Sequence, residues 1–107
     1  MGAARVRMPE SAKRGEIIEI RTMVQHPMES GFRLDNTGQP IARHIVNSFR
    51  CGYNGQEIIR TRIHPGISVN PFITFFVRVT ESGDFVFRWE DDQGGIATHT
   101  AHLTVEG

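Results

Sequence analysis

Residues 85–105, FVFRWEDDQGGIATHTAHLTV, contain two alternating patterns separated by a short polar stretch. Phe85, Phe87 and Trp89 alternate with other residues, and over residues 96–105 one alternating set is mostly small or apolar. Because successive side chains of a strand point to opposite faces of a sheet, a period of two predicts two half-buried strands. The acidic and glycine residues at 91–95 predict a turn, so this region is interpreted as a terminal β-meander.

The same period of two recurs along most of the chain, and no segment of ten or more residues shows a convincing helical stripe. Asn54-Gly55 is the strongest short-range signal for a two-residue hairpin turn of type I′. Residues 11–15 have the composition of a turn. Further strands are predicted at residues 5–8, 17–24, 45–53, 56–63 and 72–79.

About seven short antiparallel strands in 107 residues predict an all-β chain. We expect one domain, residues 1–107, folded as an immunoglobulin-like β-sandwich. Its core should contain the aromatic residues Phe75, Phe85, Phe87 and Trp89. Each such side chain buries roughly 150–250 Å², which makes them the main apolar contribution to folding.

Composition narrows the function classes. Twelve basic and twelve acidic residues give a formal net charge of zero, which argues against a nucleic-acid partner and makes self-association easier. No apolar run approaches the roughly 20 residues of a membrane-spanning helix, so we expect no membrane partner. The N-terminus lacks the apolar core of a secretory signal, which predicts a cytoplasmic chain or one exported by other means.

The five histidines raise the possibility of a metal site. His26, His44 and His64 fall at predicted strand ends or in loops, where they could converge. His99 and His102 are three apart on a predicted strand and should point to opposite faces. Because the spacing matches no zinc signature, surface or loop histidines are the preferred interpretation, and we expect no metal and no cofactor.

Cys51 is the only cysteine, and it is in phase with the apolar residues Phe49 and Tyr53. A buried, unreactive thiol is therefore preferred, and no catalytic residue is predicted. The alternative is a small metal- or thiol-dependent redox enzyme that uses Cys51 and the loop histidines. The acidic residues at 90–92 lie beside a Gly-Gly turn, where acidic side chains are common turn formers.

Two features suggest a protein-binding surface. A polar stretch from His26 to about His44 is longer than most loops of compact domains, and such loops are usually functional or disordered. If the out-of-phase apolar residues of the strands cluster, they form a patch larger than a soluble monomer normally exposes. A third hypothesis is a free-standing adhesion-type sandwich domain. The out-of-phase residues are Met23, Ile58, Phe72, Phe76, Val86 and Ile96, and the candidates for partner contact are Met28, Phe32, Phe72 and Phe76.

A series of short motifs, in a specific order and spacing, runs through nearly the whole chain. It comprises His26-Pro27-Met28-Glu29-Ser30-Gly31, Arg33, Asp35, Gly38, Ile41, Arg43, Ile45-Val46-Asn47, Phe49, Cys51, Asn54-Gly55, Asn70-Pro71-Phe72, Glu81-Ser82-Gly83, Phe85, Phe87, Trp89, Asp91, Asp92 and Gly94. Together these motifs resemble the sulfur-oxidation protein family SoxZ.

This resemblance implies an immunoglobulin-like sandwich that pairs with SoxY, the heterodimer being the carrier of bacterial thiosulfate oxidation. In that family the sulfur intermediate is held by a cysteine on the flexible glycine-rich arm of SoxY. The present chain ends Val105-Glu106-Gly107 without such an arm, so it resembles the partner subunit. The resemblance assigns no catalytic residue, and we expect a non-enzymatic subunit.

The resemblance also implies a location and further contacts. SoxZ-like chains are thought to be exported to the periplasm together with SoxY, which would reconcile the missing signal with a periplasmic location. We expect transient contacts with other sulfur-oxidation enzymes, and self-association is possible when SoxY is absent.

Overall fold

The computed structural model describes residues 1–63 and 69–107, and in these ranges all regular structure is β. No helix in this part of the chain has the length and apolar character needed to cross a membrane. The predicted connection around His64 falls partly on residues 64–68, which lie outside the described ranges. The strands are β1 (Ala4–Arg7), β2 (Ser11–Lys13), β3 (Ile17–Val24), β4 (Val46–Tyr53), β5 (Gln56–Arg62), β6 (Phe72–Arg78), β7 (Gly83–Asp91) and β8 (Ile96–Glu106).

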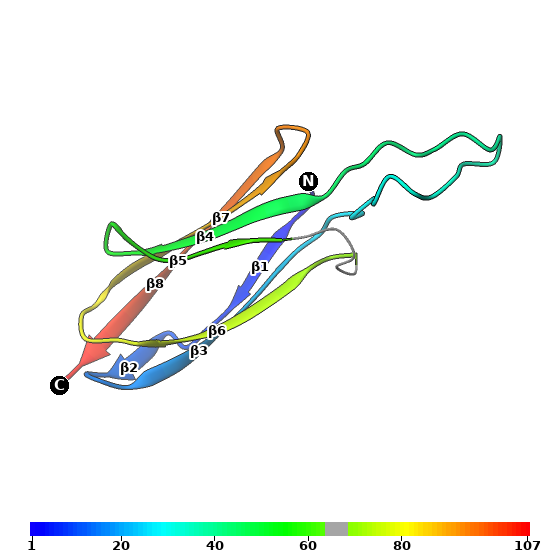
Figure 1. Ribbon diagram of the computed structural model, residues 1–107. Helices are drawn as coiled ribbons and strands as arrows, with labels where there is room; N and C mark the ends of the chain where they lie inside the picture. The colour runs from blue at the N-terminus through cyan, green and yellow to red at the C-terminus, as the bar shows by residue number, and fades with distance from the viewer. Residues whose placement is uncertain (64–68) are drawn as a thin grey trace.

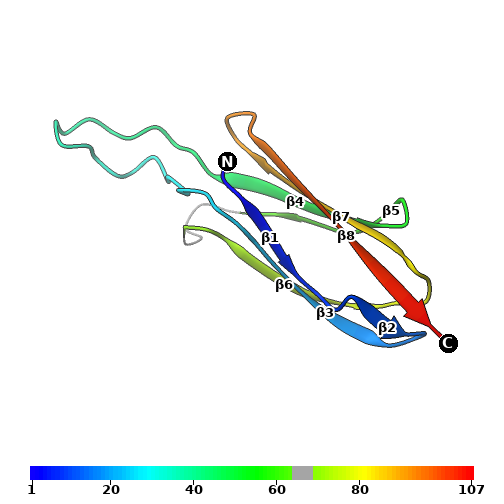
Figure 2. The ribbon, with the colours of Figure 1, turned by 180° about the vertical axis from the view of Figure 1, so that it is seen from behind.

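The strands form two sheets, one with the order β1-β3-β6 and one with the order β2-β8-β7-β4-β5. The sheets face each other as a sandwich, seen from two sides in Figures 1 and 2. The predicted all-β, immunoglobulin-like class is thus confirmed. All pairings of named strands are antiparallel except that of β2 with β8, which is parallel.

The prediction that residues 11–15 form only a turn is wrong. Residues Ser11–Lys13 form β2, because the backbone on either side is tied to β8: Thr104 N–H donates to Glu10 at 3.0 Å and Arg14 N–H to the carbonyl of Glu106 at 2.9 Å. The side chain of Ala12 is buried in the core. The pairing of β2 with β8 joins residues about ninety positions apart in the sequence, and local composition cannot reveal such a contact.

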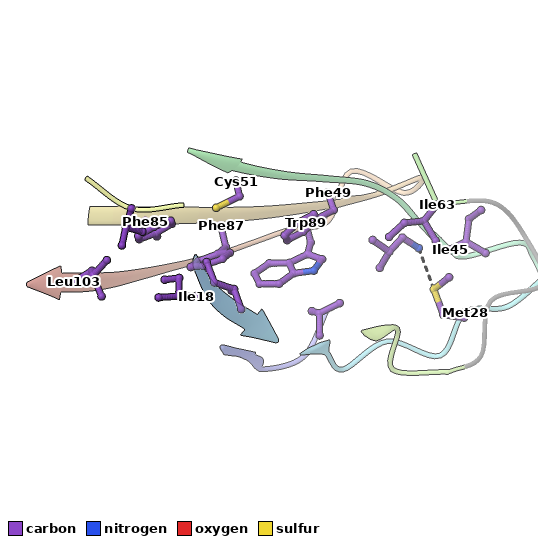
Figure 3. Packing of buried hydrophobic residues seen from close by; sticks show 14 of the residues in the cluster. Ile18, Met28, Ile45, Phe49, Cys51, Ile63, Phe85, Phe87, Trp89 and Leu103 are labelled. Carbon is purple, nitrogen blue, oxygen red and sulfur yellow. Dashed lines mark hydrogen bonds between the residues drawn. The ribbon is translucent and has the colours of Figure 1, made fainter. Parts of the chain in front are cut away.

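Most of the core residues are those that the predicted alternation places on the inner faces of the strands. Phe85, Phe87 and Trp89 have no exposed surface, and Phe49 packs on Trp89 with ring centroids 5.3 Å apart (Figure 3). Phe75, also predicted to lie in the core, is only partly buried. It comes from β6, an edge strand, where one flank of the side chain has no neighbouring strand within the described residues.

The predicted hairpin is confirmed. Asn54 and Gly55 both have positive φ, 51° and 82°, as a type I′ turn requires of its two central residues. The turn joins β4 to β5 in antiparallel register.

The long polar stretch forms a projecting arm, defined here as residues 29–44. Its two sides are joined at the base by reciprocal backbone hydrogen bonds between Glu29 and His44, at 2.7 and 2.8 Å, and near the tip by a bridge between Leu34 and Pro40. The carboxylate of Asp35 accepts hydrogen bonds from the backbone of Thr37 and Gln39 and so closes the tip. Figure 1 shows the arm extending well beyond the sandwich.

Candidate functional site

Three polar side chains meet where the arm joins the sandwich. His26 follows the end of β3, His44 ends the arm, and Asp91 ends β7. The Nε2 atoms of His26 and His44 lie 3.4 and 2.8 Å from the same oxygen, Oδ2 of Asp91. The two imidazole rings meet edge to face with centroids 4.3 Å apart. We call these three residues the His-His-Asp cluster.

The hydrogen bonds around His26 assign its tautomer. The backbone N–H of Met28 donates to Nδ1 of His26 at 3.0 Å, so Nδ1 is unprotonated and the neutral ring carries its proton on Nε2. That Nε2–H then donates to the carboxylate of Asp91. The other carboxylate oxygen, Oδ1, accepts from the backbone N–H groups of Gln93 at 3.0 Å and Gly95 at 2.6 Å.

The cluster has three potential metal ligands, with atoms all within 4.8 Å of one another. A histidine that binds a metal through Nε2 normally donates its Nδ1–H to a carboxylate, carbonyl or water. Here Nδ1 of His26 faces the N–H of Met28, so metal binding at Nε2 would place two donors against each other. The local hydrogen bonding therefore fits a polar anchor for the arm better than a metal centre.

Burial and hydrogen bonding set the charges of the cluster. Burial alone would raise the pKa of Asp91, but hydrogen bonds from His44 and from the backbone of Gly95 and Gln93 outweigh it and lower the pKa to about 2. For His26, burial and the neighbouring His44 lower the pKa, and the hydrogen bond to Asp91 opposes this only in part. Asp91 is therefore ionised and His26 neutral near pH 7.

The sequence suggested this arrangement only as a possibility. His26 and His44 do converge, but their partner is Asp91; His64 lies outside the described residues. His26 lies outside the strands, as the preferred interpretation expects, but its side chain is buried and not on the surface. Asp91 was interpreted as a turn former, and it does accept hydrogen bonds within its own turn through Oδ1. Its second oxygen, Oδ2, is hydrogen-bonded to His26 and His44. His102 instead bonds Asp84 at 2.8 Å on the surface, and His99 is only partly buried beside Phe87.

Cys51 lies in the middle of β4 with no exposed surface. Its burial raises the pKa of the thiol to about 12. Because the thiolate is the reactive form, this thiol is unreactive near neutral pH. Within the described residues no histidine or other base is hydrogen-bonded to its sulfur, and the thiol donates a long hydrogen bond to the carbonyl of Gly52 at 3.8 Å.

The four predicted contact residues have different surroundings. Phe32 on the arm is 88% exposed, and Phe72 and Phe76 on the outer face of β6 are 74% and 65% exposed. Met28 is only 8% exposed, which corrects its inclusion in a surface set. Its sulfur accepts the N–H of Val46 at 3.2 Å, and the side chain packs into the core end next to the arm (Figure 3).

Other exposed apolar side chains join these surfaces. On the three-stranded sheet, Ile17 is exposed and Met23 is partly exposed, and Met23 is the cross-strand partner of Phe72. We call Ile17, Met23, Phe72 and Phe76 the aromatic face. On the arm, Leu34 is exposed near Phe32. Ile17 and Leu34 are not among the exposed apolar residues predicted from the sequence. Ile17 could have been recognised, because it shares one strand face with the charged residues Glu19 and Arg21.

The fold and the His-His-Asp cluster together define the class of this protein: a small β-sandwich with a projecting arm that the cluster anchors at its base. A superoxide reductase (neelaredoxin) from Ignicoccus hospitalis has this fold, with a TM-score of 0.75 at 19% identity over 96% of this chain and 80% of that one. The sulfur carrier protein SoxY from Chlorobium limicola f thiosulfatophilum has it too, with a TM-score of 0.70 at 11% identity over 98% and 80%. At these identities the likeness concerns the fold alone.

The family follows from a direct match. The model of the family described as sulphur oxidation protein SoxZ matches residues 6–102, so the chain belongs to the SoxZ family. The predicted family is thus confirmed, and the chain is a sulfur-oxidation protein. No curated protein matches it.

The cluster predicts a specific pH dependence of stability. The pKa of Asp91 is lower in the folded state than its ordinary 3.8, so its contribution is present above pH 3.8 and is lost as the pH falls toward about 2. We expect this to amount to about 2 kcal/mol. The lowered pKa of His26 means that the unfolded chain takes up this proton first, so stability begins to fall below pH 6.5.

The measurement is urea unfolding of the native chain and of Asp91→Asn at about pH 7.5, 5 and 3. The variant should be less stable at neutral pH by about 1–3 kcal/mol, because one neutral amide cannot accept from both its turn and the histidines. It should also lose less stability between the two lower pH values. Parallel curves for the two proteins would show that Asp91 does not carry the acidic part of the dependence.

The burial of Met28 predicts a folding role rather than a contact role. Met28→Ala should lower the free energy of unfolding by about 2–5 kcal/mol, because it leaves a cavity at the core end. Phe32→Ala, the matched change on the exposed arm, should alter it by less than about 0.5 kcal/mol. Equal effects of the two substitutions in urea unfolding would contradict the assignment.

The burial of the Cys51 thiol predicts that it reacts slowly with alkylating reagents in the folded protein. A thiol-specific alkylating reagent should label Cys51 slowly in the native protein at neutral pH and rapidly once denaturant unfolds the chain. Mass spectrometry of timed samples gives both rates. Rapid labelling of the folded protein, rising with pH near neutrality, would instead reveal an activated thiolate and favour the redox-enzyme hypothesis.

Proposed function

We propose that this chain is a non-catalytic subunit that binds a SoxY-like partner and presents it to the enzymes of thiosulfate oxidation. The observation that carries the proposal is the state of Cys51: a sulfur carrier needs an accessible thiol, and this one is buried with a pKa of about 12. This supports a carrier group that is supplied by another chain. Membership of the SoxZ family supports SoxY as the source of that chain.

The surface supports a protein-binding role. The aromatic face exposes Phe72 and Phe76, and the arm exposes Phe32; large aromatic side chains are typical anchors of protein interfaces. Exposed apolar groups of this size are unfavourable in a free-standing monomer, which argues against the adhesion-type alternative. We place the main partner contact on the aromatic face and a second contact on the arm.

The redox-enzyme hypothesis has less support. Its cysteine is inert, and the hydrogen bond from Met28 to Nδ1 of His26 opposes metal binding in the His-His-Asp cluster. Solved structures with this fold include proteins called superoxide reductases, but similarity of fold does not transfer activity. We also propose that the chain acts in the periplasm and is exported with its partner, as the family resemblance implies.

The test is co-expression with the SoxY-like chain encoded nearest in the genome, followed by size-exclusion chromatography with light scattering. We expect a one-to-one complex that survives dilution. Phe76→Asp should weaken it at least about tenfold, because a charge would be buried in an apolar contact. Val86→Asp is the matched control, since Val86 is exposed on the outer face of the other sheet.

Separate elution of two folded proteins would contradict the proposed function. An unchanged dissociation constant for Phe76→Asp, in a complex that does form, would remove the aromatic face from the interface while leaving the function intact. The corresponding measurement with Phe32→Asp then tests the arm. Circular dichroism of each variant checks that the sandwich is still folded.

A further inference from the structure

The two sheets have four edge strands, and three of them carry features that discourage pairing with another chain. Strand β1 is four residues long and includes two arginines. Strand β2 has three residues. Strand β5 carries Glu57, Arg60 and Arg62, and its pairing with β4 is irregular between Cys51 and Gly52. Short length, charge and bulges are the usual protections of a sheet edge.

Strand β6 has none of these protections over most of its length. Its sequence, Phe72-Ile73-Thr74-Phe75-Phe76-Val77-Arg78, contains seven residues, one terminal charge, no proline and a continuous register with β3. Within the described residues β3 is its one strand neighbour, and both figures of the fold show it at the margin of its sheet (Figures 1 and 2). Such a strand is a template for another strand.

Backbone hydrogen bonds identify which groups of β6 have no backbone partner among the residues that the structure describes. The N–H of Val79 donates to Glu16 at 2.9 Å, and the carbonyl of Pro71 accepts from Val24 at 3.4 Å, both toward β3. Because the direction alternates along an antiparallel strand, the odd-numbered residues between them also face β3. The N–H and C=O groups of Phe72, Thr74 and Phe76 therefore point away from the sheet, into the open edge.

We propose that β6 pairs antiparallel with β6 of a second copy of this chain, which joins two three-stranded sheets into one six-stranded sheet. The pairing is centred on Thr74, which lies opposite Thr74 of the second copy. In this register Phe72 of each copy lies opposite Phe76 of the other, so two Phe72–Phe76 pairs form on the outer face. All of these residues have outward-facing backbone groups, so each pair closes two hydrogen bonds.

The self-pairing is chemically complementary. Aromatic cross-strand pairs and threonine pairs are both favourable in sheets, and the register places no like charges directly opposite each other. The chain has a formal net charge of zero, so two copies do not repel each other at long range. The contact is confined to one strand and its flanking rings, which belongs to the small interfaces of weak, reversible complexes.

This inference does not depend on the proposed function, because it concerns the chain without its partner. It uses the backbone edge of β6 together with the Phe72–Phe76 cross-strand pairs, and these two side chains also belong to the aromatic face of the partner contact proposed above. The two are tested by different measurements: one by the oligomeric state of the isolated chain, the other by complex formation with a SoxY-like chain.

The first experiment is sedimentation velocity of the isolated chain from about 1 to about 500 µM, the range of weak complexes. We expect a reversible monomer–dimer equilibrium. Thr74→Pro removes the outward N–H and keeps the bonds to β3, since proline is tolerated on an edge strand where its nitrogen faces solvent. It should raise the dimer dissociation constant at least about tenfold.

Thr74→Val is the matched control, because it keeps the N–H and the β-branched shape but loses the hydroxyl. It should dimerise within about threefold of the native chain. Thermal unfolding followed by circular dichroism shows whether each variant is folded. If Thr74→Pro does not fold, Thr74→Lys replaces it, since two lysines would then face each other across the axis and should weaken the dimer comparably.

A cross-link tests the register. In Thr74→Cys the two new cysteines would be opposite each other, with Cα atoms about 5.5 Å apart, within the range of a disulfide. Mild oxidation should give a covalent dimer, whereas Ile58→Cys, at the charged edge of β5, should not. A chain that stays monomeric throughout the range, or a dimer that Thr74→Pro leaves unchanged, would overturn the inference, as would efficient cross-linking at Ile58→Cys alone.

Discussion

The carboxylate of Asp91 is the interaction on which the region between arm and sandwich depends. One oxygen accepts from the backbone of its own turn, at Gly95 and Gln93, and the other faces the imidazoles of His26 and His44. A single buried charge thereby ties the end of the five-stranded sheet to the end of β3 and to the base of the arm. A buried carboxylate is costly unless it is well hydrogen-bonded, and here the bonds are sufficient to keep its pKa near 2.

Much of the fold could be predicted from local sequence, because the alternation of a half-buried strand has a period of two. The turn at Asn54-Gly55 could be predicted equally well, because a type I′ turn needs positive φ at both central residues and this dipeptide adopts it readily. Strand β2 could not be predicted, because three residues are too few to show an alternating pattern. Its formation depends on pairing with β8, which is far away in the sequence. Phe75 was placed too deep because the sequence does not show which strands are edges.

The site was harder to predict than the fold, for a physical reason. Outside regular strands there is no alternation to distinguish inward from outward side chains, so Met28 and Phe32, four residues apart, were treated alike. One is buried against the backbone of Val46 and the other is 88% exposed. The convergence of His26 with His44 was foreseen as a possibility, but the choice of Asp91 as their partner depends on where β7 ends in space, which no spacing in the sequence reveals.

The chain shares its fold with proteins called superoxide reductases and with SoxY, so its role must come from its side chains and edges. Its only thiol is locked in the core, and its buried histidine is hydrogen-bonded in a way that leaves no basic nitrogen free for a metal. The unusual features lie on the surface: an anchored arm with an exposed phenylalanine, an aromatic sheet face, and one unprotected strand edge beside it. Natural sheet proteins usually protect their edge strands, and three of the four edges here are protected, so the unprotected edge of β6 is the feature that the proposed self-pairing explains.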